Sequence, residues 1–128
     1  MQNLVKVFKA LADTNRMRIL KMLEKKKMCV CELSAALQIT QPSVSKHLGI
    51  LKNAGLVIDV KNGQWTDHTL CTENGNPYVS ALLAQLKEWI NESETVIEDR
   101  KKIAVLSRYD LCLRIKTPSD SNAMEKVL

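Results

Sequence analysis

Apolar residues recur three and four positions apart through the first half of the chain, the spacing of amphipathic helices with one buried side. The pattern predicts helices over residues 3–11, 13–27, 31–37 and 40–54. Only Gln38-Ile39, a tight turn, separates the last two. The first half of the chain is therefore predicted to be helical and to contain a helix-turn-helix.

The stretch from residue 40 to residue 55 has the signals of a complete helix. The hydroxyl of Thr40 suits the N-cap, and Pro42 falls in the first turn, where its missing N–H costs nothing. Gly55 can take the left-handed conformation that ends a helix. The buried stripe consists of Val44, Leu48 and Leu51.

The opposite face of this helix is short, polar and only mildly charged. An ordinary surface helix also has a polar face, but it usually uses Glu and Lys rather than Ser, Gln and Asn, which form helices less readily. We therefore interpret residues 40–55 as a reading helix, which places polar groups on base edges and its N-terminal dipole near phosphate. The predicted DNA-binding residues are Gln41, Ser43, Ser45, Lys46 and His47, of which His47 either contacts phosphate or packs locally.

Residues 56–70 are rich in strand-forming residues on both sides of Asn62-Gly63, which is a strong hairpin signal. A helix-turn-helix followed at once by a hairpin is a winged helix. The predicted fold class is therefore mainly α with a β-hairpin wing, a winged helix-turn-helix.

After the hairpin, a near-heptad apolar pattern predicts one long helix from residue 78 to about residue 108. A small domain cannot cover a helix of that length, so we expect a homodimer that forms through the terminal helices. The alternative is a helix folded back over its own core. We place the DNA-binding and dimerisation domain at residues 1–108 and a partly flexible C-terminal tail at 109–128.

Length and charge agree with a small regulator. The 128 residues suit one compact domain, and the net charge of +5 suits a polyanionic partner. No run has the length of a membrane span and no signal-peptide pattern appears, so we expect a cytoplasmic protein with reduced cysteines and no membrane partner. No Cys/His/acid set or phosphate-binding glycine loop indicates an enzyme.

Cys29 and Cys31 are the candidate metal ligands, because soft ions prefer thiolates to nitrogen or oxygen. Positions two apart on a regular helix point about 200° away from each other. Coordination of one ion by both sulfurs is therefore expected to distort the start of the helix that supports the reading helix. The neighbouring Lys25–Lys27 are expected to lower the thiol pKa values. The alternative role is that of small core residues.

Four segments, together with the order of the elements, carry a family resemblance over about residues 3–105. They are Leu11–Leu20, Gln41–Leu48, Leu51–Leu56 and Gly63–Trp65. This pattern resembles the ArsR/SmtB family of metal- and metalloid-responsive winged-helix repressors. Within that family, Met28–Leu33 is similar to the Cys-Val-Cys motif of arsenite/antimonite and cadmium/lead sensors. The arsenical type often has a third cysteine at the place of Ser34.

The resemblance implies a homodimeric repressor of double-stranded operator DNA that needs no cofactor for DNA binding. Its inducer would be a trivalent metalloid ion, arsenite or antimonite, bound by Cys29 and Cys31. The zinc site of the family needs histidine on the long helix, and residues 76–108 contain none. Cadmium/lead sensors add cysteines from an N-terminal arm, and residues 1–28 contain none.

Three points stay open. The third ligand is Cys71, Cys112 or a small cellular thiol. A cadmium/lead-responsive or thiol-redox-responsive repressor of the same fold is the alternative function. A further class is a winged-helix interaction module without a DNA role.

Overall fold

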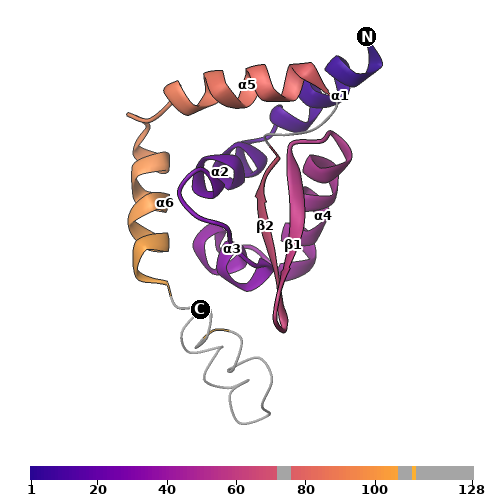
Figure 1. Cartoon of the computed structure of the whole chain (residues 1–128). Coiled ribbons are helices and arrows are strands. Elements are labelled where there is room, and N and C mark those ends of the chain that lie inside the picture. The colour runs from indigo at the N-terminus through magenta and orange to yellow at the C-terminus, as the bar shows by residue number, and fades with distance from the viewer. Residues whose placement is uncertain (72–75, 107–110, 112–128) are drawn as a thin grey trace.

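The computed structural model describes residues 1–71, 76–106 and 111 (Figure 1). Its helices and strands confirm the predicted fold class, mainly helical with one two-stranded antiparallel hairpin. The elements are α1 (Gln2–Leu11), α2 (Thr14–Leu23), α3 (Val30–Leu37), α4 (Gln41–Asn53), β1 (Val57–Asn62), β2 (Trp65–Leu70), α5 (Pro77–Glu88) and α6 (Glu94–Val105).

One apolar cluster forms the core, and all six helices contribute to it. Leu20 of α2, Leu33 of α3 and Leu51 of α4 are fully buried at its centre. Burying a side chain of this size stabilises the fold by about 1.5–3 kcal/mol. The core therefore holds α3 and α4, the two helices of the helix-turn-helix, firmly against α2.

Helix α4 begins and ends as its sequence predicts. The Thr40 hydroxyl oxygen accepts a hydrogen bond from the backbone N–H of Ser43 at 3.3 Å, and Pro42 lies in the first turn. Gly55 takes the left-handed conformation with φ of 82°, and its N–H donates to the carbonyl of Lys52 at 2.9 Å. The reading helix thus has a defined orientation at both ends.

The hairpin is confirmed, and its turn lies one residue later than the Asn-Gly signal suggests. Asn62 pairs with Trp65, which leaves Gly63 and Gln64 as a two-residue loop. Of these two, only Gly63 has a positive φ, at 64°, and glycine in the first loop position is the pattern of a type II′ turn. The loop extends the wing away from the helical core (Figure 1).

The prediction of one long helix from residue 78 to 108 is wrong. The chain breaks after α5, where Trp89 is extended and Ile90 has a φ of 54°. The side-chain amide of Asn91 donates to the carbonyl of Lys87 at 3.0 Å, and Ser93 is the N-cap of α6. Asn and Ser favour such local bonds over helix, and these outweigh the apolar periodicity.

Helix α6 then runs back beside α2 (Figure 1). Both carboxylate oxygens of Asp99 accept hydrogen bonds at 2.8 Å from the guanidinium of Arg18. Arg100 pairs with Glu24 at 3.0 Å. The alternative of a helix folded back over its own core therefore holds for α6. Of the predicted tail, only Leu111 is among the described residues.

No helix in the described part of the chain combines the length and the apolar character needed to cross a membrane.

Candidate DNA-reading face and thiol pair

The exposed face of α4 carries Ser43, Ser45 and Lys46, while Val44 and Leu48 between them are buried. This arrangement leaves short hydroxyl side chains and one lysine on the outside of the first turns of the helix. Serine hydroxyls and lysine amines suit contacts with base edges and phosphates. The geometry is compatible with the predicted reading role of these three residues.

Gln41 is placed differently from the other predicted DNA contacts. It lies three residues before Val44 and seven before Leu48, so it continues the buried stripe to the start of α4 and is half-buried. Its side-chain amide nitrogen lies 3.7 Å from the Cys31 sulfur on α3, within hydrogen-bonding distance. Gln41 therefore faces the supporting helix.

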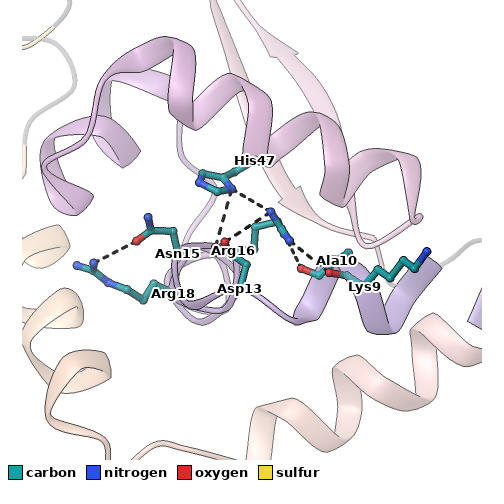
Figure 2. A network of polar contacts seen from close by, with 7 residues as sticks. All are labelled: Lys9, Ala10, Asp13, Asn15, Arg16, Arg18 and His47. Carbon is teal, nitrogen blue, oxygen red and sulfur yellow. Dashed lines mark hydrogen bonds and ion pairs between the residues drawn. The ribbon is translucent and has the colours of Figure 1, made fainter. Parts of the chain in front are cut away.

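His47 packs locally, which is one of the two alternatives that its sequence left open. Its Nδ1 lies 3.3 Å from a guanidinium nitrogen of Arg16 and 4.0 Å from a carboxylate oxygen of Asp13 (Figure 2). The same guanidinium donates to the carbonyl of Ala10 at 2.7 Å and to that of Lys9 at 3.3 Å. This network joins the end of α1, the start of α2 and the middle of α4.

The sequence pattern did not identify Arg16 as the centre of this network, and Asp13 is the N-cap of α2. The backbone N–H of Arg16 donates to the Asp13 carboxylate at 3.0 Å and is the main reason that the pKa of Asp13 is lowered. No periodic pattern pairs Arg16 with His47, which lies 31 positions away.

Cys29 and Cys31, which we call the thiol pair, come together without any distortion of α3. The 200° separation applies only to two residues within one helix, whereas Cys29 is the N-cap of α3 and has an extended backbone, with φ of −90° and ψ of 170°. Its sulfur therefore turns back over the first helical turn, where it hydrogen-bonds with the Cys31 thiol. The distortion expected when one ion binds both sulfurs stays a prediction, and α3 begins at Val30, one residue earlier than the sequence predicted.

The thiol pair is built into a capping box. The Cys29 sulfur accepts a hydrogen bond from the backbone N–H of Glu32, and the Glu32 carboxylate accepts one from the backbone N–H of Cys29 at 3.1 Å. Cys29 is buried and Cys31 is half-buried. One sulfur of the pair thus serves as a helix cap, and the other is more open to solvent.

Hydrogen bonding lowers the pKa of Cys29 to about 7 from its ordinary 9.0. The hydrogen bond from Cys31 is the largest cause, and burial and the Glu32 charge oppose it. The Lys25–Lys27 run, which the sequence suggested as the cause, is not among the causes of this shift, and Lys26 pairs with Glu32 at 3.7 Å. A substantial fraction of Cys29 is therefore a thiolate, the form that binds metals, near neutral pH.

The wing is attached to the residue that precedes the thiol pair. Met28 and His68 form a two-way backbone bridge, with N–H to carbonyl distances of 3.1 and 2.8 Å. The Nδ1 of His68 also lies 2.8 Å from the Asp59 carboxylate across the hairpin. Burial is the main cause of the lowered pKa of His68, against the effect of Asp59. Thus the wing and the reading helix both reach the thiol pair directly.

The described residues contain no group of three His, Cys, Asp or Glu side chains placed to hold a metal ion. Cys71 is buried at the end of β2 and does not complete such a group with the thiol pair. Cys112 lies outside the described residues. Ser34, at the place where the arsenical pattern often has cysteine, donates its hydroxyl to the carbonyl of Ile39 and closes the helix-turn-helix turn.

Comparison with known proteins extends these observations. The family profile "Bacterial regulatory protein, arsR family" matches residues 13–59. The chain is similar to the "Arsenical resistance operon repressor" of Escherichia coli (strain K12). The two are 37% identical over 95 residues, which are 72% of this chain and 77% of that protein.

Two further relatives show the breadth of the similarity. The "Cadmium resistance transcriptional regulatory protein CadC homolog" of Staphylococcus aureus is 30% identical over 87 residues, which are 67% of this chain and 72% of that protein. The fold resembles the solution structure of the homodimeric winged helix-turn-helix DNA-binding domain Mb0332 of Mycobacterium bovis. That match has 25% identity and a TM-score of 0.58, and it covers 68% of this chain and 77% of that one.

Proposed function

The chain belongs to the ArsR family of bacterial regulatory proteins, and on this premise we propose that it is an arsenic- or antimony-responsive operator repressor. Its family consists of DNA-binding transcriptional regulators and not of enzymes. The proposed inducer site is the thiol pair, and the proposed DNA contacts are Ser43, Ser45 and Lys46. The observation that carries the proposal is the hydrogen-bonded thiol pair at the start of the helix that supports α4.

The donor set of the thiol pair fits a trivalent metalloid. The two thiols hydrogen-bond to each other, and the pKa of Cys29 is lowered to about 7, so a thiolate is available near neutral pH. Arsenous acid, As(OH)3, exchanges a hydroxyl for each thiol sulfur and releases one water per As–S bond, with no transfer of electrons. Soft ions of this kind prefer sulfur to oxygen donors. The third sulfur would come from Cys112 or from a small cellular thiol.

The pair also has the position that an inducer site needs. Cys29 is next to Met28, which bridges to the wing, and Cys31 contacts Gln41 at the start of α4. An ion that binds both sulfurs competes with the hydrogen bonds that these sulfurs make at the start of α3. Because an inducer shifts an equilibrium only through such differential contacts, we place the release of DNA at this junction.

We also propose that the repressor is a homodimer that forms through α1 and α5, in line with the homodimeric state named for the Mycobacterium bovis relative. The two helices pack against each other at the end of the molecule farthest from the wing tip (Figure 1). Phe8 of α1 is 54% exposed and Trp89, at the end of α5, is 49% exposed. Large apolar side chains left open on neighbouring elements are typical of an interface. Leu86 is core, so it is not part of that surface.

The decisive experiment is release of the protein from operator DNA by arsenite in Cys29→Ser and Cys31→Ser variants. Serine is a preferred N-cap, so Cys29→Ser keeps the cap and should fold and bind DNA at least as well as the parent. Cys31→Ser keeps a hydrogen-bond donor to Cys29. Both variants should stay on the operator at an arsenite concentration that releases the parent. Cys71→Ser, a buried cysteine outside the pair, is the matched control and should release normally.

The same titration separates the alternatives. Release by cadmium at lower concentration than by arsenite would assign a cadmium/lead sensor. Release by peroxide and not by arsenite would assign a redox sensor. If both thiol-pair variants respond to arsenite like the parent, the proposed site is wrong.

A further inference from the structure

The contact between Gln41 and Cys31 is the direct side-chain link between the thiol pair and the reading helix. The amide nitrogen of Gln41 lies 3.7 Å from the Cys31 sulfur, at hydrogen-bonding distance for a sulfur acceptor. Gln41 is the first residue of α4, directly after the Thr40 N-cap. Any movement of this side chain is therefore passed to the turn of α4 that carries Ser43 and Ser45.

A second contact shows that the Cys31 link is not needed merely to close the turn. The Ser34 hydroxyl donates to the carbonyl of Ile39, and Gln38 closes α3 in the left-handed conformation with φ of 58°. These bonds hold the connection between α3 and α4 whatever the state of the thiol pair. The Gln41 contact adds a second attachment, and its acceptor is one of the proposed ligand atoms.

The chemistry of sulfur makes this attachment sensitive to ion binding. A thiolate sulfur has a full negative charge and is a strong acceptor for an amide N–H, whereas a sulfur bonded to a soft ion shares one electron pair with that ion and is a weaker acceptor. A half-buried amide whose acceptor has weakened favours another partner, because a donor shielded from water is unfavourable without an acceptor. The side chain therefore turns away from Cys31 and the first turn of α4 shifts with it.

We propose that Gln41 is the positioning residue through which α4 responds to the state of the Cys31 sulfur. With the sulfur free, the contact holds the start of α4 in the orientation that reads DNA. With the sulfur engaged by an ion, the contact is lost and affinity for the operator falls. This inference rests on the proposed function and adds to it the route from ligand to reading helix. It gives Gln41 a role that differs from the base contact expected from its sequence.

The test is Gln41→Met, which keeps the length of the side chain and removes the N–H donor. The operator Kd is measured with and without arsenite, and the ratio of the two values is the coupling. The variant should bind arsenite as the parent does, read by ultraviolet absorbance of the arsenic–sulfur bonds. Its coupling ratio should fall by about two- to tenfold, the range that loss of one hydrogen bond gives. Its affinity without arsenite should move toward that of the arsenite-loaded parent.

Ser45→Ala is the matched control, because Ser45 lies on the exposed face of the same helix. Loss of a DNA contact there should weaken operator binding equally with and without arsenite, and so leave the coupling ratio at the parental value. A second measurement does not depend on DNA affinity. The side-chain amide resonances of Gln41, assigned by their absence in Gln41→Met, should shift when arsenite is added to the parent.

The outcomes are distinct. A parent that arsenite does not release refutes the proposed function, and the inference with it. A parent that is released, together with a Gln41→Met variant of parental coupling ratio, refutes the inference alone. A loss of arsenite binding in Gln41→Met also overturns it, because the amide would then serve the ligand site itself. Unshifted Gln41 resonances in the arsenite-loaded parent lead to the same conclusion.

Discussion

A buried ion pair joins α6 to α2 beside the Arg100–Glu24 pair, and its removal should be measurable. The guanidinium of Arg18 donates two hydrogen bonds of 2.8 Å to the two carboxylate oxygens of Asp99. The Asp99 side chain is only 3% exposed, and that of Arg18 is 20% exposed. The hydrogen bond to Asp99 raises the pKa of Arg18. Arg18→Ala would leave the carboxylate of Asp99 buried without this partner.

The expected cost follows from this burial. Removing one partner of a buried ion pair typically destabilises a protein by about 3–5 kcal/mol, because the remaining charge stays out of water. One partner here is a fifth exposed, so we expect the lower end, about 3 kcal/mol, for Arg18→Ala. Asp99→Asn keeps one acceptor oxygen and should cost about 1–2 kcal/mol. Lys101→Ala on the same helix breaks only the exposed Lys101–Glu98 pair and should have no measurable effect.

Urea denaturation followed by circular dichroism gives the three free energies of unfolding. Amide hydrogen exchange of α6 then distinguishes local undocking from global unfolding, because only α6 amides lose protection if the helix detaches alone. An Arg18→Ala variant as stable as Lys101→Ala, with α6 amides still protected, would refute the reasoning. It would mean that the apolar contacts of Val96 and Ile103 are enough to hold α6.

Two further predictions concern the DNA and dimer surfaces. Lys46→Ala should weaken binding to all DNA and lower the slope of log Kd against log salt by about one unit, whereas Lys101→Ala on α6 should leave the slope unchanged. If Lys46→Ala has the same slope of log Kd against log salt as the parent, Lys46 does not contact phosphate. Phe8→Glu combined with Trp89→Glu should give monomers in sedimentation and abolish operator binding, whereas Val105→Glu, 84% exposed on α6, should remain a dimer. A dimeric double variant would place the interface elsewhere.

The features that the sequence predicts well are those with a local cause. Helix α4 follows from its cap at Thr40, its proline at position 42 and its glycine at position 55, all within one stretch of chain. The hairpin follows from Gly63 between strand-forming runs. Each signal involves neighbours along the chain, so no knowledge of tertiary structure is required to interpret it.

The prediction fails where distant residues decide the structure. The apolar period from Val79 to Ile103 runs through the break at Ile90, and periodicity alone does not reveal a bend. The Arg18–Asp99 pair, which fixes α6 after that bend, joins positions 81 residues apart. Once α6 folds back, Leu86 belongs to the core of its own chain rather than to a partner.

The thiol pair illustrates how the exact start of a helix decides the chemistry of the residues beside it. With Cys29 inside α3, the two sulfurs would point about 200° apart. With Cys29 as the N-cap, they hydrogen-bond to each other. Cysteine is not among the preferred cap residues, and helix ends vary by one or two residues, so Cys29 was not recognised as the N-cap. Glu32, three residues after Cys29, was the available signal, because it completes a capping box.

The position of Cys29 as the N-cap of α3 determines how much free energy an ion bound there can contribute to the release of DNA. Capping contacts are worth about 0.5–2 kcal/mol, and a single hydrogen bond such as that from Gln41 to Cys31 contributes about 0.5–1.5 kcal/mol net. Allosteric coupling between a ligand and a second site is typically about 1–3 kcal/mol. An ion that binds both sulfurs disturbs the Cys29 cap and the Gln41–Cys31 hydrogen bond. The sum of their free energies is similar to the free energy of such a coupling. Release of DNA therefore requires no large rearrangement of the core, since the two contacts at the start of α3 and of α4 suffice.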